Sequence, residues 1–264
     1  MGIEALILGL DGVILETEAA HLDACNEAFA RCGLGLRWSM AQLRQASRIW
    51  GATNAVAALI DKLGLPVAGK EAVRLMQEKN MLFRDAVLAR RPELNSACAA
   101  LMEDALQRGC KLAVVTDMPA QTATALLDRA FGNAVTNMFA AVVSGVDLNG
   151  SSDNGPCQLV LRTVGVDAEA CIAIDAGAPG LRAAQCAGIW AMAVGPYEKD
   201  IARISGADVW CPQWQELRHW IKPGNPAQSG GGPCVDFDTL RALRHGRRVN
   251  PVTFKPAVPV QLAA

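Results

Sequence analysis

Short apolar runs and longer amphipathic segments alternate along most of this chain of 264 residues. The apolar runs end in turn or polar residues, a pattern typical of strands that are buried on both faces. We expect such strands at residues 5–8, 111–115, 140–144, 171–174, 189–194 and 207–210. The segments between most of them carry apolar residues at helical spacing. This alternation predicts an α/β fold with a right-handed, doubly wound and mostly parallel sheet.

The stretch from residue 16 to residue 89 contains no apolar run of the strand type. Its pattern instead predicts helices at about 18–34, 40–47, 53–63 and 70–89. A helical insert after the first strand of an α/β domain is the arrangement of a lid that excludes water and selects substrates. We therefore predict a Rossmann-like core at 1–15 and 90–223, an α-helical cap domain at 16–89, and a C-terminal extension at 224–264.

The C-terminal extension begins with a linker rich in glycine, serine and proline. Residues 236–245 then predict a short helix with Phe237 and Leu240 on its apolar side. Arg247 and Arg248 follow, and the prolines beyond them favour extended backbone. We expect these four side chains to bind a protein partner. The alternatives are disorder or packing of the tail onto its own core.

The composition narrows the class of protein. A net charge of −1 and 51% hydrophobic residues argue against nucleic acid or an anionic membrane surface as the main partner. The chain has no apolar run long enough to span a membrane and no secretory signal at its N-terminus. Its nine cysteines are scattered without a Cys-x-x-Cys pair, which is typical of reduced thiols rather than disulfides or zinc ligands. We expect a cytoplasmic protein.

Three segments carry a family resemblance. Residues 9–18 read Gly-Leu-Asp-Gly-Val-Ile-Leu-Glu-Thr-Glu, 114–119 read Val-Val-Thr-Asp-Met-Pro, and 180–189 read Gly-Leu-Arg-Ala-Ala-Gln-Cys-Ala-Gly-Ile. Together they resemble the haloacid dehalogenase-like (HAD) phosphatases, most closely the helical-cap subfamily with beta-phosphoglucomutase and CbbY-like sugar phosphatases. The resemblance covers about residues 1–223. It implies attack of an aspartate on phosphate, with magnesium bridging phosphate and carboxylates.

Three charged groups of that family pattern are missing here. Gly9 stands where the family has its nucleophilic aspartate, and Ala176 stands where it has a metal-binding aspartate. The phosphate-clamping lysine maps to Ser151, and residues 112–198 contain no lysine. Losing even one member of a catalytic set removes several powers of ten in rate. We therefore expect no bound metal and assign no catalytic residue.

Other family positions are retained. Asp11 keeps the place of the general acid/base, Thr116 that of the hydroxyl that bonds the phosphoryl group, and Asp175 that of an acidic residue that reaches the metal through water. Each also has a structural explanation as a turn or loop residue. His21 aligns with a histidine near the family's substrate entrance, so the resemblance implies substrate binding by Glu18, His21 and Thr116.

The resemblance and the losses together predict a catalytically degenerate pseudophosphatase. It would act as a binding, regulatory or assembly partner, through its tail or through a small phosphorylated ligand, and would need no cofactor. The alternative is an active magnesium-dependent sugar-phosphate phosphatase or phosphosugar mutase, in which Asp11 or a water replaces the nucleophile. A third hypothesis is a different chemistry in the same pocket, with a cysteine or Asp117 recruited.

Overall fold

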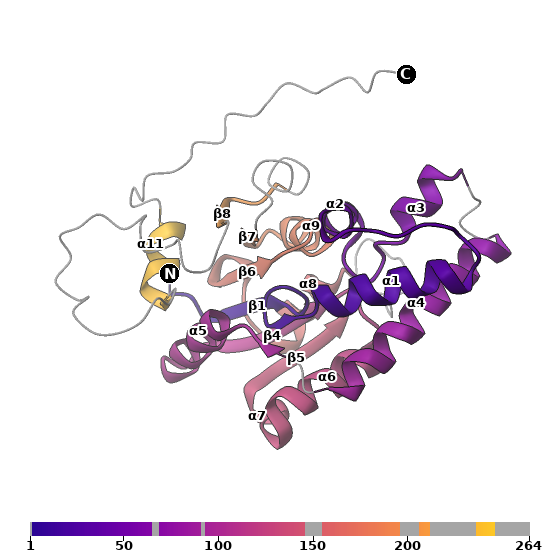
Figure 1. The fold of residues 1–264 in the computed structure, drawn as a ribbon. Coiled ribbons are helices and arrows are strands. Elements are labelled where there is room, and N and C mark those ends of the chain that lie inside the picture. Colours follow the sequence, from indigo (N-terminus) through magenta and orange to yellow (C-terminus); the bar gives the residue numbers. More distant parts are fainter. Residues whose placement is uncertain are drawn as a thin grey trace.

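Six parallel strands form the central sheet (Figure 1). The computed structural model describes residues 2–64, 69–90, 93–145, 155–195, 206–211 and 236–245. The strands are β1 (Ala5–Gly9), β4 (Lys111–Thr116), β5 (Phe139–Ser144), β6 (Cys171–Asp175), β7 (Trp190–Val194) and β8 (Val209–Cys211). They lie in the order β5-β4-β1-β6-β7-β8, and each pairs in parallel with its neighbours. The predicted α/β fold with a mostly parallel sheet is confirmed.

Helices cover both faces of this sheet because both faces of its strands are apolar. Along β1, Leu6 and Leu8 pack into one hydrophobic cluster and Ala5 and Ile7 into another, as the strand period of two requires. The first cluster includes α5 (Ser96–Gln107) and α6 (Ala120–Phe131), and the second includes α8 (Pro156–Val164) and α9 (Ala178–Cys186). The chain completes these layers with η1 (Gly132–Ala134), α7 (Val135–Met138) and η4 (Ala168–Ala170).

Four helices follow the first strand and pack mainly on one another (Figure 1). They are α1 (Glu18–Arg31), α2 (Met40–Trp50), α3 (Ala57–Lys62) and α4 (Lys70–Ala89). Their apolar sides form a third cluster that includes Phe29, Leu43 and Leu75. A capping box between Ser39 and Gln42 begins α2. These helices are the predicted cap, and its exact boundaries stay a prediction.

A small antiparallel ribbon forms where the chain leaves the sheet for the cap and where it returns from the cap. Strand β2 (Leu15–Glu16) pairs with β3 (Glu93–Leu94), so that Leu15 faces Leu94 and Glu16 faces Glu93. The sequence did not predict it, because two residues are too few to show alternation. The expectation that no strand occurs from residue 16 onward in the insert was therefore wrong at Glu16.

The C-terminal helix α11 (Phe237–Arg244) packs on α5 of its own chain. Leu240 is fully buried in the first cluster, and Phe237 is 6% exposed. The Phe237 amide donates to Asp104 Oδ2 over 2.8 Å, and Arg108 Nη2 lies 3.0 Å from Asp238 Oδ2. The prediction that Phe237 and Leu240 contact a protein partner does not agree with this placement, because both side chains are buried against the core.

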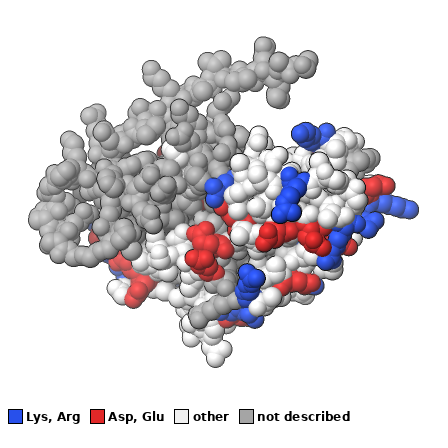
Figure 2. Space-filling model, in the orientation of Figure 1, with Lys and Arg blue, Asp and Glu red and all other residues white. Residues whose placement is uncertain are grey.

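Several predicted residues lie outside the described ranges. They are Ser151, Arg247, Arg248 and the linker at 224–235. Within the described residues, no helix is long and apolar enough to cross a membrane. The eight cysteines of these ranges are all free thiols. On the face shown in Figure 2, acidic and basic side chains are interspersed over the described surface.

Candidate active site

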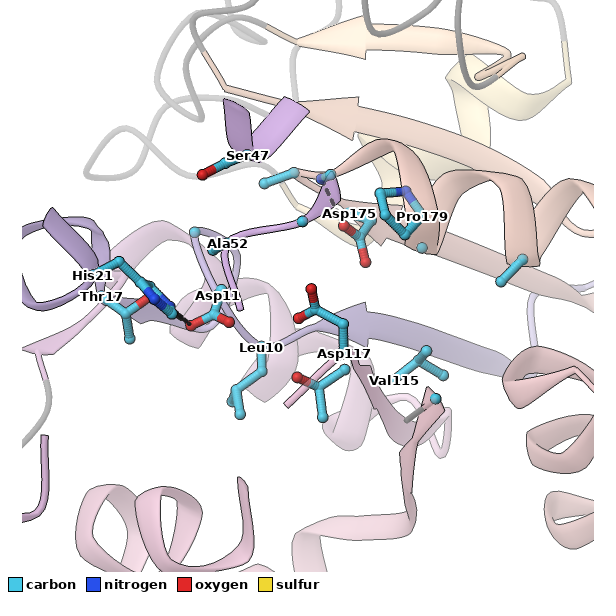
Figure 3. A pocket seen from close by; sticks show the side chains of 18 of the residues that line it. Leu10, Asp11, Thr17, His21, Ser47, Ala52, Val115, Asp117, Asp175 and Pro179 are labelled. Carbon is cyan, nitrogen blue, oxygen red and sulfur yellow. Dashed lines mark hydrogen bonds and ion pairs between the residues drawn. The ribbon is translucent and has the colours of Figure 1, made fainter. Parts of the chain in front are cut away.

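A cavity of about 140 Å³ lies where the carboxyl ends of β1, β4 and β6 meet the cap. The carboxyl edge of a parallel sheet is where α/β proteins bind their ligands. The cavity is lined from the sheet by Asp11, Thr116, Asp117 and Asp175, and from the cap by His21 among others. In Figure 3 the carboxyl groups of Asp11, Asp117 and Asp175 face one central space.

Asp11 is held by a tight turn after β1. Gly12 adopts a left-handed backbone with φ of 71°, and the amide of Leu15 donates back to the carbonyl of Leu10 over 3.0 Å. The Thr17 hydroxyl, at the start of α1, donates to Asp11 Oδ1 over 2.5 Å. Burial alone would raise the pKa of Asp11, but His21, the Thr17 hydroxyl and the ammonium of Lys79 hold that pKa below its usual value. Asp11 is therefore ionised at neutral pH.

A buried histidine and a buried lysine lie within the cap, on α1 and α4. The ring of His21 stacks on Phe83 with centroids 3.7 Å apart, and its Nε2 lies 3.4 Å from Asp11 Oδ1. Lys79 Nζ donates to the carbonyls of Ala52 and Thr53 over 3.0 and 2.7 Å. Burial lowers the pKa of His21 to about 4 and that of Lys79 to about 8. His21 is thus neutral at pH 7, while most of Lys79 is charged.

Asp117 and Asp175 have pKa values shifted in the opposite direction to that of Asp11. Burial, reinforced by the negative charge of Asp11, raises the pKa of Asp117 to about 6. Burial raises the pKa of Asp175 to about 7, although the Gly177 amide donates to Asp175 Oδ1 over 2.7 Å and opposes this shift. Three neighbouring carboxyl groups cannot all ionise freely in one cavity.

Asp175 also fills the space beside Gly9. A Cβ atom built on Gly9 would lie 2.6 Å from Asp175 Oδ2 and 3.0 Å from its Cγ, closer than real Cβ contacts allow. A Cβ built on Gly180 would clash with the same carboxyl group. The carboxyl of Asp175 therefore occupies the place that any side chain at position 9 would need.

The cap lies directly on this set of residues. Gly51 follows α2 with φ of 78°, and a Cβ there would overlap Asp117 Oδ2, so only glycine fits. Arg44 forms a bidentate ion pair with Glu18, with Nη2 2.7 Å from Oε2 and Nε 3.0 Å from Oε1. From the cap, the cavity is lined by Glu18, His21, Leu43, Ser47 and Gly51, among others.

A family model for haloacid dehalogenase-like hydrolases matches residues 3–188 of this chain. The chain belongs to this family. Protein CbbY of Cupriavidus necator is 30% identical over 259 residues, which cover 92% of this chain and 98% of the relative. Protein CbbY of Cereibacter sphaeroides is 28% identical, covering 81% of this chain and 94% of the relative.

Solved structures give the same grouping. The crystal structure of CbbY from Rhodobacter sphaeroides in complex with phosphate has a TM-score of 0.64 and 26% identity, and the match covers 79% of this chain and 93% of that one. A structure of a putative phosphoglycolate phosphatase from Lactobacillus delbrueckii has a TM-score of 0.67 at 20% identity and shows the likeness of fold alone.

The residues present do not fit the magnesium ion that the family implies. Gly9 has no side chain, Ala176 offers a methyl group, and Asp175 accepts the Gly177 amide. Among the described residues, no group of three or more histidine, cysteine, aspartate or glutamate side chains is placed to hold a metal ion. Hard divalent cations need closely placed oxygen ligands, and positions 9 and 176 supply none from their side chains.

Most of the residues that the sequence singled out come together at the cavity. Asp11, Glu18, His21, Thr116 and Asp175 all line it, as does the substituted position 176. The Thr116 hydroxyl accepts the amide of Met118 over 3.1 Å, which agrees with its structural explanation as a turn residue. The catalytic or binding roles of these residues stay predictions.

Lys79 was not among the residues that the sequence singled out. Its signal was the spacing along α4, where Leu75, Lys79, Phe83 and Val87 recur at intervals of four and define the buried side of the helix. A lysine in such a row is either unfavourably buried or paired, and here backbone carbonyls pair it.

Proposed function

We propose that this member of the HAD-like family is catalytically silent and acts by binding. The observation that carries the proposal is Gly9, which has no carboxylate to attack phosphate and whose Cβ position lies against the Asp175 carboxyl. Without an attacking aspartate no aspartyl-phosphate forms. A cavity that lacks the attacking aspartate can still bind a ligand, and the bound ligand can change how the protein binds a partner.

The electrostatics of the cavity support the same proposal. A phosphate ester carries negative charge and needs cations to neutralise it in the transition state. No lysine or arginine is among the described residues that line the cavity, whereas three aspartates are. The ammonium of Lys79 is bound to backbone carbonyls instead. These residues repel a phosphate rather than clamp it.

The competing hypothesis is an active magnesium-dependent phosphatase or mutase. A mutant of the Rhodobacter sphaeroides relative has been solved with xylulose-(1,5)-bisphosphate, at 26% identity to this chain. That sugar bisphosphate is therefore the first compound to test here. The competing hypothesis needs another group to attack phosphate, and Asp11 is the carboxylate nearest to that role by its lowered pKa.

The test measures phosphate release from xylulose-(1,5)-bisphosphate and a panel of sugar monophosphates, with and without magnesium. A CbbY relative run in parallel shows that the assay detects turnover. We expect no release above the protein-free rate from this chain. Magnesium-dependent release that Asp11→Asn abolishes would overturn the proposal and establish the competing hypothesis.

A triple variant tests whether the three missing family groups alone account for the absence of activity. Gly9→Asp, Ser151→Lys and Ala176→Asp together restore the three missing groups. Partial turnover by this variant, with none by the unmodified chain, would show that the substitutions alone silence the site. The Asp175 carboxyl must move for residue 9 to carry a side chain, so we expect any recovered rate to be low.

A further inference from the structure

The wall of the cavity carries an excess of negative charge over the described residues. Asp11, Asp117 and Asp175 face the same space from three directions (Figure 3). Glu18 also lines the cavity, but its carboxylate is paired with Arg44. No lysine or arginine accompanies them in the described lining, and the nearby ammonium of Lys79 offsets only part of their charge, so entry of a cation is favoured electrostatically over entry of an anion.

Unpaired hydrogen-bonding atoms lie in the same wall. Oδ2 of Asp11 and Oδ2 of Asp117 are both buried and have no hydrogen-bond partner within the chain. His21 is fully buried and lines the cavity; its Nε2 lies 3.4 Å from Asp11 Oδ1, whereas its Nδ1 has no hydrogen-bond partner. Buried polar atoms are costly when they have no partner. A ligand that donates several hydrogen bonds would satisfy them.

The remaining lining is largely apolar. Leu10, Leu43, Val115, Pro156 and Pro179 contribute hydrocarbon surface to the cavity. A small ligand that presents a charged donor at one end and hydrocarbon at the other matches this combination. A compact metal ion does not, because no described cluster is placed to coordinate one.

We propose that the cavity binds a small organic cation of the primary ammonium class, with its N–H groups on Asp11 and Asp117 and its alkyl part on the apolar wall. The inference rests on the proposed function, because it takes the cavity to be a binding site that does not cleave phosphate esters. An ammonium group has three donors and no acceptor, which suits a wall with unpaired carboxylate oxygens. The cavity of about 140 Å³ admits an amine of a few carbon atoms.

The experiment titrates the full ¹⁵N-labelled chain with n-butylammonium chloride at constant ionic strength and follows amide chemical shifts. n-Butanol, sodium butyrate, inorganic phosphate and magnesium chloride are the comparison probes. Asp117→Asn removes one charged acceptor and keeps the shape of the side chain. Asp85→Asn is the matched control, because it makes the same change at a side chain that is 63% exposed on α4.

We expect saturable shifts around the cavity with n-butylammonium and none with butyrate or phosphate. Asp117→Asn weakens this binding about 10- to 100-fold, the usual effect of losing a charged hydrogen-bond partner, and Asp85→Asn leaves it unchanged. Equal binding of n-butanol would show an apolar cavity without cation selectivity and would overturn the inference. So would saturable binding of phosphate or magnesium without binding of the amine.

The two proposals fail in different ways. Magnesium-dependent phosphate release contradicts the proposed silent function, whatever the amine titration shows. Absence of amine binding in a chain that also releases no phosphate contradicts only the inference about the ligand.

Discussion

Replacing Gly9 by alanine tests whether the Asp175 carboxyl really occupies the place beside β1. Gly9 lies in a strand without a left-handed backbone, so the backbone itself tolerates alanine and gains about 0.5–1 kcal/mol from it. Any destabilisation must therefore come from the new methyl group meeting its neighbours. The nearest is Asp175 Oδ2, 2.6 Å from the Cβ position.

The expected loss of stability follows from the packing and the hydrogen bond of the Asp175 carboxyl. Forcing an extra methyl group into a packed interior costs about 1–3 kcal/mol. If the carboxyl turns aside instead, it loses the 2.7 Å hydrogen bond from the Gly177 amide, and a buried unpaired donor costs about 1–3 kcal/mol. Allowing for the backbone gain, we expect Gly9→Ala to lower the free energy of unfolding by about 1 kcal/mol.

The assay is urea unfolding of Gly9→Ala, Asp175→Ala, the double variant and the unmodified chain. In the Asp175→Ala background the obstacle is gone, so we expect Gly9→Ala to stabilise the chain there by the backbone gain of about 0.5–1 kcal/mol. The coupling between the two substitutions should then be about 2 kcal/mol. Gly35→Ala is the matched control, since a Cβ at Gly35 meets no atom within 4 Å.

Additive effects of the two substitutions would refute the reasoning. So would a Gly9→Ala change as small as that of Gly35→Ala, which we expect within about 0.5 kcal/mol. Either result would mean that the Asp175 carboxyl does not fill the place of the missing side chain.

Two further predictions concern stability. The pKa of Asp117 is raised from 3.8 to about 6, so the native state binds a proton more tightly than the unfolded state, and ionised Asp117 costs stability above pH 6. One pKa unit corresponds to about 1.4 kcal/mol, so Asp117→Asn should stabilise the chain by up to about 3 kcal/mol at pH 8. This gain should vanish as the pH falls toward 4. An equal gain at both pH values in urea unfolding would contradict the prediction. Leu240→Ala should cost about 2–4 kcal/mol in the same assay, because Leu240 is fully buried between α11 and the core. Leu36→Ala, at a side chain 44% exposed, should cost less than about 0.5 kcal/mol, and equal costs would show that α11 is not packed on the core.

The strands and helices of the core were predictable because the spacing of apolar residues along the sequence depends on which side chains are buried. The run at 5–8 is apolar at every position, and only a strand covered on both faces explains so short a run. The ribbon of β2 and β3 was not predictable, because two residues per strand show no period. Its pairing depends on the path of the chain between sheet and cap.

The site was predictable in part. The position of Asp11 and Asp175 at strand ends follows from the parallel sheet, whose carboxyl edge gathers them. That Asp175 would fill the space beside Gly9 depends on side-chain packing across two strands, which one sequence does not reveal. Whether the tail helix packs on its own core or on a partner was left open by the sequence, because an amphipathic pattern identifies an apolar side but not the surface that covers it.

The most direct test of the account is phosphate release from sugar phosphates in the presence of magnesium. We expect this chain to release no phosphate above the protein-free rate, because Gly9 has no carboxylate to attack phosphate and lies against the Asp175 carboxyl. Magnesium-dependent turnover that is lost in Asp11→Asn would contradict it.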